Sequence, residues 1–267
     1  MRIAALHCMW KAGWVLLLFS IAAHPQSPQA TRIEALIDSQ FPDSKCPGLS
    51  VAIAAGGEIF VSKALGSADI EQNVPLTIRS AHRLASLSKL VTGTIMMELV
   101  EAGRLKLDAP VRVYLPELPA SYGKVTARHL LSHQAGVRAY RDLEEVFSTV
   151  HYPTSRDALK AFAADPLLFE PGTKTEYSTF GFTLLGAVAE AITKRPFQEV
   201  ARDFFQRHGI TGFAIDDPIE IVPGRVRGYL EDRTASGRTR ASMTPATNSR
   251  REASPRRRKI SCDSGWR

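Results

Sequence analysis

The feature of the sequence that most constrains the fold is an apolar helical pattern in residues 82–103, HRLASLSKLVTGTIMMELVEAG. Apolar side chains recur there at helical spacing, and Gly103 stands where a helix commonly ends. The first turn nevertheless carries Ser86, Ser88 and Lys89, an amine beside two hydroxyls. We therefore predict a buried helix with polar groups gathered at its N-terminal end.

The spacing of Ser86 and Lys89 suits nucleophilic chemistry. Residues three positions apart lie on one face of a helix, so the Lys89 ammonium can reach the Ser86 hydroxyl. A serine becomes a good nucleophile when a nearby base takes its proton, and a desolvated lysine with a lowered pKa can be that base. Unpaired backbone N–H groups in the first turn favour a developing negative charge. A capping serine beside a solvated lysine has the same spacing, so neighbouring motifs must decide.

The rest of the chain predicts a mixture of strands and helices. The stretch GLSVAIAAGGEIFVSKALG indicates a β-hairpin with strands near 49–55 and 59–64, joined at Gly56-Gly57. Prolines within residues 103–119 predict that this segment follows the surface without forming a long element. Apolar periodicity predicts further helices at 30–41, 126–136, 155–169, 180–193 and 196–208.

Positive charge is concentrated near the C-terminal end. The 267 residues carry a formal net charge of +7, while residues 222–267 alone hold +8, from twelve Arg and Lys against four Asp and Glu. Residues 1–221 therefore carry −1, which gives no support for nucleic-acid binding by the main domain. Residues 234–267 contain no Leu, Val, Phe or Tyr. We predict a basic disordered segment there and a folded domain over 30–233.

The N-terminal residues predict export. Arg2 and Lys11 supply positive charge ahead of and at the start of an apolar run, AGWVLLLFSIAA. This run has the length of a signal-peptide core and is shorter than the roughly 20 residues of a membrane-spanning helix. We predict a signal peptide over 1–23 and a periplasmic or secreted protein; the alternative is an uncleaved anchor, the one case in which membrane attachment is predicted. Cys46 is predicted to be a buried free thiol.

Several motifs give the Ser86 and Lys89 pattern a context. RLASLSK resembles the active-site motif of the serine β-lactamase and penicillin-binding-protein superfamily, and neighbouring segments are similar to that family in the same order. These segments are GSADIEQNVPLT, LVEAGRLKLDAPVRVYLPELP, LLSHQAGV and FEPGTKTEYSTFGFTLLGAVAEAI. The resemblance covers about residues 48–210. It is greatest to the LACTB-like branch of β-lactamase-related serine hydrolases, in which Tyr-Ser-Thr can stand for the commoner Tyr-x-Asn.

The resemblance implies roles for four residues. Ser86 would be the acylated nucleophile, and Lys89 would assist proton transfer. Tyr177 matches the tyrosine of the second motif, which implies a place opposite the serine and a general acid–base role. Thr179 occupies the position usually held by asparagine. As a substrate-binding residue it offers a hydroxyl in place of the amide's paired donor and acceptor.

The resemblance also implies an α+β fold. In the β-lactamase/transpeptidase-like fold an antiparallel sheet flanked by helices lies beside a mostly helical domain, with the serine in the cleft between them. The family's third motif, on an edge strand that usually supplies an oxyanion-hole N–H, has no counterpart after Tyr177. We therefore expect the C-terminal strands to be missing. His133 with Asp142 or Asp165 offers a catalytic triad as an alternative, but the family gives this histidine a structural role.

These observations predict an exported serine hydrolase that forms an acyl-enzyme at Ser86. Its substrates would be small molecules or peptides with an amide, ester or β-lactam bond. No cofactor, metal or nucleic-acid partner is predicted, because no His or Cys spacing suggests a metal and AAGGE is a hairpin turn that no helix follows. The alternative is a non-catalytic product, either a truncated pseudoenzyme or a peptidoglycan-binding module.

The basic segment suggests its own explanation. With suitable codons, residues 243–265 read from the third base give a Gly-rich turn followed by an amphipathic helix pattern. That pattern resembles the segment that the family carries next. We therefore predict that the chain from about Met243 onward is read in the wrong frame, which the codons of the gene can test directly.

Overall fold

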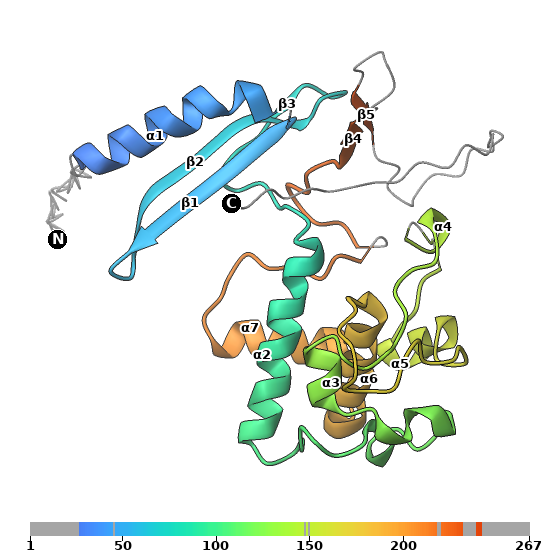
Figure 1. Ribbon diagram of the computed structural model, residues 1–267. Helices are drawn as coiled ribbons and strands as arrows, with labels where there is room; N and C mark the ends of the chain where they lie inside the picture. The colour runs from blue at the N-terminus through green and yellow to red at the C-terminus, as the bar shows by residue number, and fades with distance from the viewer. Residues whose placement is uncertain are drawn as a thin grey trace, which may run out of the picture.

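The computed structural model describes residues 27–44, 46–146, 148, 150–217, 220–231 and 239–241. The predicted signal peptide over 1–23 lies outside these residues, as does most of the segment 234–267. The described chain is an α+β fold in which an antiparallel sheet with one long helix lies beside a larger helical part (Figure 1). This arrangement confirms the predicted fold class.

The sheet begins with the predicted hairpin. Strands β1 (Gly48–Ala55) and β2 (Glu58–Asp69) pair antiparallel, and the short β3 (Val74–Pro75) extends the order to β1-β2-β3. Gly56 and Gly57 form the turn with φ values of +61° and +87°, which side chains rarely tolerate. The predicted hairpin is therefore confirmed, with a register shift between Ile53 and Ala54.

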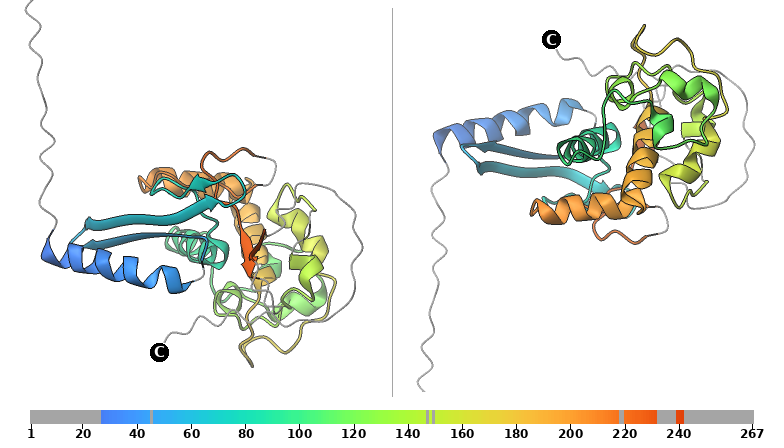
Figure 2. Two further views of the ribbon diagram at one scale, coloured as in Figure 1. Left: turned by 90° about the horizontal axis from the view of Figure 1, so that it is seen from above. Right: turned by 90° about the horizontal axis from the view of Figure 1, so that it is seen from below.

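Helix α1 (Pro28–Gln40) covers one face of this sheet (Figure 2). The ion pair between Lys63 Nζ and Asp38 Oδ2, at 2.6 Å, joins the β2 strand to the helix. On β1, the side chains of Ser50, Ala52 and Ala54 are exposed, while those between them are partly buried. The sheet is thus packed on one face, as the alternation of its residues requires.

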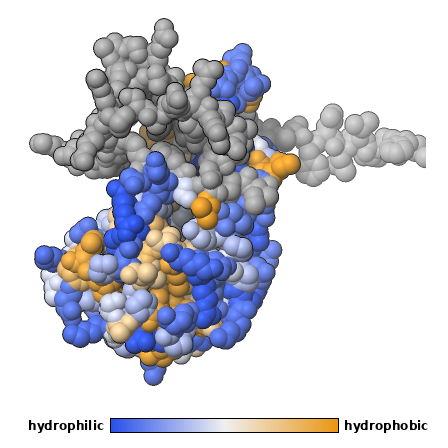
Figure 3. Space-filling view, turned by 90° about the vertical axis from the view of Figure 1, so that its right-hand side faces the viewer, coloured by the Kyte–Doolittle hydropathy of each residue, from blue (hydrophilic) through white to orange (hydrophobic). Residues whose placement is uncertain are grey.

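The helical part lies around α2 (Ser88–Glu101) and α6 (Thr179–Thr193). Its surface, seen from the side of α4 and α5, mixes apolar and polar patches (Figure 3). The other helices are α3 (Ala127–Leu131), α4 (Leu143–Val146), α5 (Ser155–Ala158) and α7 (Phe197–Arg207). Short 3-10 turns are η1 (Pro42–Ser44), η2 (Ala85–Leu87), η3 (Val111–Val113), η4 (Ala120–Lys124) and η5 (Leu159–Ala161).

The core of the helical part is built on α6. Leu184, Leu185 and Val188 are fully buried in it. The predicted surface path of residues 103–119 is wrong in one respect. The segment has no long element, but Val111 and Leu115 are fully buried against the same core, because its turns direct apolar side chains inward.

Several helix boundaries differ from those predicted. The helix predicted from the opening motif begins only at Ser88, after the separate turn η2. The helices predicted over 126–136 and 155–169 are shorter than predicted. Helix α3 ends at Leu131, shortly before His133, whose φ of +59° is incompatible with a continued α-helix. Helix α5 passes directly into the turn η5, which is capped by Phe162 with a φ of −149°. The helices α6 and α7 match their predicted ranges within a few residues.

The chain returns to the sheet after α7. Ala81 pairs with Arg225 in a parallel bridge, and the Arg227 N–H donates to the Ala68 carbonyl at 2.9 Å. The Tyr229 hydroxyl accepts from the Ile70 N–H at 2.7 Å. Strand β4 (Tyr229–Glu231) then pairs with β5 (Thr239–Ala241). Of the segment 234–267, which is predicted to be disordered, only residues 239–241 are described, and the rest of that prediction lies outside the described residues.

Cys46 also differs from its prediction. The thiol is free, as predicted, but it is exposed and not buried. It follows the turn η1, whose Ser44 hydroxyl accepts the Cys46 N–H at 3.2 Å. This turn places the side chain on the surface ahead of β1.

Candidate active site

Ser86 lies in the turn η2, immediately before α2. The preceding residue, Ala85, has a φ of +45°, a left-handed conformation that costs a residue with a side chain about 1 kcal/mol or more. The turn brings the Ser86 hydroxyl to the surface at the start of α2. The predicted nucleophile therefore lies in a tight turn and not on the helix itself.

Two predicted residues converge on the Ser86 Oγ. The Tyr177 hydroxyl donates to it at 2.7 Å, and Lys89 Nζ donates at 3.3 Å. Lys89 is partly buried, and its Nζ lies 4.8 Å from the centre of the Tyr177 ring and 5.7 Å from that of Phe182. The structure thus brings together a serine from η2, a lysine from α2 and a tyrosine from the segment just before α6.

Helix α6 positions Tyr177. Ser178, the N-cap of this helix, accepts the Gly181 N–H at 3.0 Å and donates to the Arg138 carbonyl at 2.7 Å. Its side chain is buried, so both bonds are shielded from water. The cap fixes the direction in which the chain enters the helix and so places the preceding tyrosine over Ser86.

The electrostatics favour a proton-accepting tyrosine. Burial raises the pKa of the Tyr177 hydroxyl, but hydrogen bonds with Lys89 and Ser86 and the positive charge of Lys89 outweigh it. The net pKa lies below the usual value of 10.0. A cation beside the phenol stabilises its ionised form, which is the form able to take a proton from serine.

His133 contacts both the Tyr177 ring and the backbone of Ser178. Its Nδ1 accepts the Ser178 N–H at 3.2 Å, so the neutral ring carries its proton on Nε2. The ring centre lies 4.5 Å from that of Tyr177. Burial and the charge of Lys89 both lower the pKa of His133 below 6.5. The histidine therefore packs beside the site as a neutral ring.

The two aspartates of the alternative triad bond elsewhere. The Asp165 carboxylate accepts from Arg138 Nε at 2.6 Å, and Asp142 Oδ1 accepts the Glu145 N–H at 2.9 Å. Among the described hydrogen bonds, neither carboxylate reaches the His133 ring. The geometry gives the triad no orienting carboxylate.

Thr179 lies at the first position of α6. Its hydroxyl helps to lower the pKa of Tyr177. It lines a shallow hollow together with Lys89 and Thr154, whereas Ser86 and Tyr177 face a second hollow. The predicted substrate-binding residue thus contacts the tyrosine but lines a different depression from the nucleophile.

The hollow at Ser86 has a volume of about 590 Å³. Apart from Ser86, Lys89, His133 and Tyr177, its walls are mainly apolar. Leu87 and Leu90 are 60% and 70% exposed there, on either side of Lys89 in the chain. A substrate at Ser86 would contact these leucines.

The contribution of Arg138 to the site was not predicted from the sequence. This arginine is buried, with Nε bonded to Asp165 at 2.6 Å and Nη1 bonded to Glu145 at 2.7 Å. Its carbonyl is the group that holds the Ser178 hydroxyl. No spacing rule reveals this cluster, because its members meet only through loop geometry.

The described residues contain no group of three or more His, Cys, Asp or Glu that could hold a metal ion. Within the same residues, no helix has both the length and the apolar character needed to cross a membrane.

The fold and the site together define a class. An antiparallel sheet beside a helical part, with Ser86, Lys89 and Tyr177 converging at the start of α2, is the arrangement of the serine β-lactamase and penicillin-binding-protein superfamily. The family model described as Beta-lactamase matches residues 31–251. The chain belongs to that family, which confirms the resemblance read from its motifs.

Individual proteins show the same relationship. The human serine beta-lactamase-like protein LACTB, mitochondrial, is 26% identical over 255 residues, covering 70% of this chain and 47% of its own length. A penicillin-binding protein from Bacillus halodurans has 30% identity and a TM-score of 0.64, with coverage of 77% and 63%. EstCE1, titled a hydrolase with promiscuous acyltransferase activity, has 26% identity and a TM-score of 0.65, with coverage of 80% and 59%. The chain spans about half the length of the human relative.

Proposed function

We propose that this protein is a serine hydrolase that forms an acyl-enzyme at Ser86 on an amide, ester or β-lactam. The observation that carries the proposal is the convergence of Tyr177 and Lys89 on the Ser86 Oγ, at 2.7 and 3.3 Å. A nucleophile, a proton acceptor and a cation that favours the acceptor's ionised form are the groups that acyl transfer requires.

The proposed reaction has two halves. The reaction starts from the ionised form of Tyr177, which the Lys89 charge favours and in which the hydrogen bond between the two oxygens is donated by Ser86. The phenolate takes the proton of Ser86, whose Oγ attacks the carbonyl carbon and forms a tetrahedral intermediate. The intermediate collapses when the bond to the leaving amine or alcohol breaks, and Tyr177 returns the proton to that group. Water then attacks the ester formed at Ser86 and loses a proton to Tyr177. The second tetrahedral intermediate collapses as the bond between the acyl carbon and Ser86 Oγ breaks, and Tyr177 returns the proton to Ser86 Oγ, which releases the acid and restores the enzyme. The Lys89 amine, with its Nζ 4.8 Å from the centre of the Tyr177 ring, is the group placed to stabilise the phenolate.

The similar proteins support acyl chemistry without fixing the substrate. EstCE1 is by its title a hydrolase and acyltransferase, and the Bacillus halodurans protein is a penicillin-binding protein. Both chemistries begin with transfer of an acyl group to a nucleophile. We therefore propose the reaction class for this chain and treat ester, amide and β-lactam as substrates to be distinguished by experiment.

Covalent labelling tests the proposal. The folded full chain is treated with a fluorescent fluorophosphonate and, separately, with a fluorescent β-lactam. We expect labelling that disappears in Ser86→Ala and persists in Ser88→Ala, the matched control two residues away. Mass spectrometry of the labelled peptide should find the adduct on Ser86.

The opposite result defines the alternative. A soluble protein with an unchanged circular dichroism spectrum that takes up neither probe would be a pseudoenzyme or a peptidoglycan-binding module. An adduct on Ser88 would show that the nucleophile has been assigned to the wrong serine.

We also propose that the protein is exported, on the strength of the apolar run at 12–23. The human relative is by its printed name mitochondrial, so family membership leaves the compartment open. Fusing residues 1–30 to a reporter enzyme that is active only outside the bacterial cytoplasm tests the proposal. An inactive fusion, with the reporter made in full, would contradict it.

A further inference from the structure

A third cavity lies beside the N-terminal turn of α2. It has a volume of about 480 Å³, within the range of about 300–1,000 Å³ that is typical of small-molecule pockets. Its walls come from residues 80–84, α2, α7 and the loop that follows α7. Leu84 lines both this cavity and the hollow at Ser86, so the two are neighbours divided by the turn η2.

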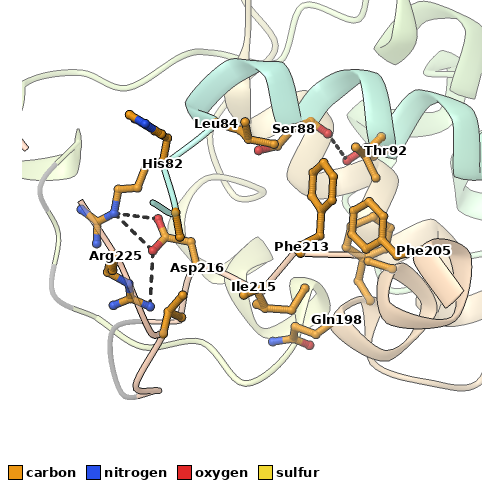
Figure 4. A pocket seen from close by; sticks show the side chains of 18 of the residues that line it. His82, Leu84, Ser88, Thr92, Gln198, Phe205, Phe213, Ile215, Asp216 and Arg225 are labelled. Atoms are coloured by element: carbon orange, nitrogen blue, oxygen red, sulfur yellow. Dashed lines mark hydrogen bonds and ion pairs between the residues drawn. The ribbon is translucent and has the colours of Figure 1, made fainter. Parts of the chain in front are cut away.

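One end of the cavity is apolar. Phe205 of α7 stacks on Phe213 of the loop, with ring centres 4.3 Å apart, and Ile215 lies beside them (Figure 4). Phe213 is 45% exposed although it faces this space. An exposed aromatic wall of this kind gains free energy when an apolar ligand covers it.

The other end is cationic. Figure 4 shows Asp216 and Arg225 at the end opposite the phenylalanines. Arg83 Nε lies 2.9 Å from Asp216 Oδ2, and Arg225 Nη2 lies 3.8 Å from Asp216 Oδ1. Two guanidinium groups thus share one carboxylate, which leaves a net positive charge among the lining residues. In the described part of the chain, both terminal nitrogens of Arg83 lack a hydrogen-bond acceptor.

The apolar end and the cationic end of the cavity together suit a ligand with a hydrocarbon chain and an anionic head group. We propose that the cavity binds a single-chain amphipathic carboxylate, with the carboxylate at Arg83 and Arg225 and the hydrocarbon chain against Phe205, Phe213 and Ile215. Guanidinium groups bind carboxylates through paired N–H donors, which gives the head group its position. The apolar wall supplies the larger share of the affinity, because every methylene of the chain that leaves water for this wall adds to the binding free energy.

Calorimetric titration of the full chain with octanoate tests the proposal. We expect saturable binding with one octanoate per chain, and binding of octanol, which has the same chain length and no charge, at least about tenfold weaker. Arg83→Gln and Arg225→Gln should each weaken octanoate binding about tenfold or more and leave octanol binding unchanged. Arg32→Gln, an exposed arginine on α1, is the matched control and should change neither.

A filling variant locates the site independently of charge. Ala214 lines the cavity and is exposed, so Ala214→Phe can occupy the space without disturbing the core. It should abolish the binding of both compounds while the circular dichroism spectrum stays unchanged. Full octanoate binding by this variant, equal affinity for octanol, or no saturable binding by the parent chain would each overturn the proposal.

Discussion

At the scale of single residues, the roles of Lys89, Tyr177 and His133 can be separated. Lys89 and Tyr177 contact the Ser86 Oγ, whereas His133 contacts the Ser178 backbone and the face of Tyr177. We expect Lys89→Ala and Tyr177→Phe to slow acylation by about 10²–10⁴-fold, the usual contribution of a general acid–base group. His133→Ala should have a much smaller effect. Stopped-flow labelling of folded variants measures all three, and an equal loss in His133→Ala would favour the triad.

His133 also predicts a pH dependence of stability. Its pKa in the folded protein lies below 6.5, so the unfolded chain binds the proton more readily. Its contribution to the free energy of unfolding is therefore complete above pH 6.5 and is lost as the pH falls below 6.5 and through the lower pKa of the folded protein. Protonation would also place a second cation beside Lys89 and remove the acceptor of the Ser178 N–H.

The variant His133→Gln isolates this contribution, because its amide oxygen can accept the Ser178 N–H but does not titrate. Urea unfolding at pH 7 and pH 5 should show a smaller loss of stability in the variant than in the parent chain. Equal losses in the two proteins would assign the pH dependence to other groups.

At the scale of elements, a buried carboxylate joins three helices. Glu190 of α6 accepts the backbone N–H groups of Ser155 and Arg156 at 2.8 and 2.9 Å, and that of Phe197 at 2.9 Å. These donors belong to the first turns of α5 and α7, where intrahelical acceptors are lacking. Glu190→Gln replaces one acceptor oxygen by a donor, so we expect a loss of about 1–3 kcal/mol in urea unfolding.

The exposed Glu199 provides the control for this measurement. It pairs with Arg195 at 3.1 Å on the surface of α7. Glu199→Gln should change the free energy of unfolding by less than about 1 kcal/mol. A loss in Glu190→Gln no greater than that of the control would show that the three N–H groups find other partners.

The elements also show what the sequence could predict. The hairpin, α6 and α7 follow local rules of turn chemistry and periodicity, and they form as predicted. The turn η2 does not, because Ala85 adopts a positive φ that no local preference favours and that only the surrounding packing can hold. The buried residues of 105–125 were missed for a similar reason, since irregular segments carry no period from which burial can be read.

The site divides along the same line. The contact between Ser86 and Lys89 was predictable from their three-residue spacing, whereas Tyr177 was predicted only through the resemblance of its motif to that of the family. The structure places all three in contact. The cluster of Arg138 with Asp165 and Glu145 was not, because its bonds join residues whose separation follows no helical or strand period. Thr179 was assigned by position in the motif, and the hollow that it lines differs from that of the nucleophile.

At the scale of the whole molecule, the sheet has an open side. Helix α1 covers one face of the sheet. Among the described residues β1 pairs only with β2, so the edge of β1 that points away from β2 has no backbone partners. An edge with unpaired N–H and C=O groups is a template for pairing with another chain. We therefore expect the isolated chain to self-associate through β1 as its concentration rises.

A lysine on the β1 edge tests this expectation. Ala52 is exposed on β1, so Ala52→Lys places a charge that a second strand would have to bury. We expect light scattering at high protein concentration to fall in this variant while labelling of Ser86 is unchanged. Gln40→Lys, which adds the same charge at the end of α1, should scatter like the parent chain. Equal scattering in all three proteins would mean that association uses another surface, because a charge on β1 weakens association only if a second chain pairs with that strand.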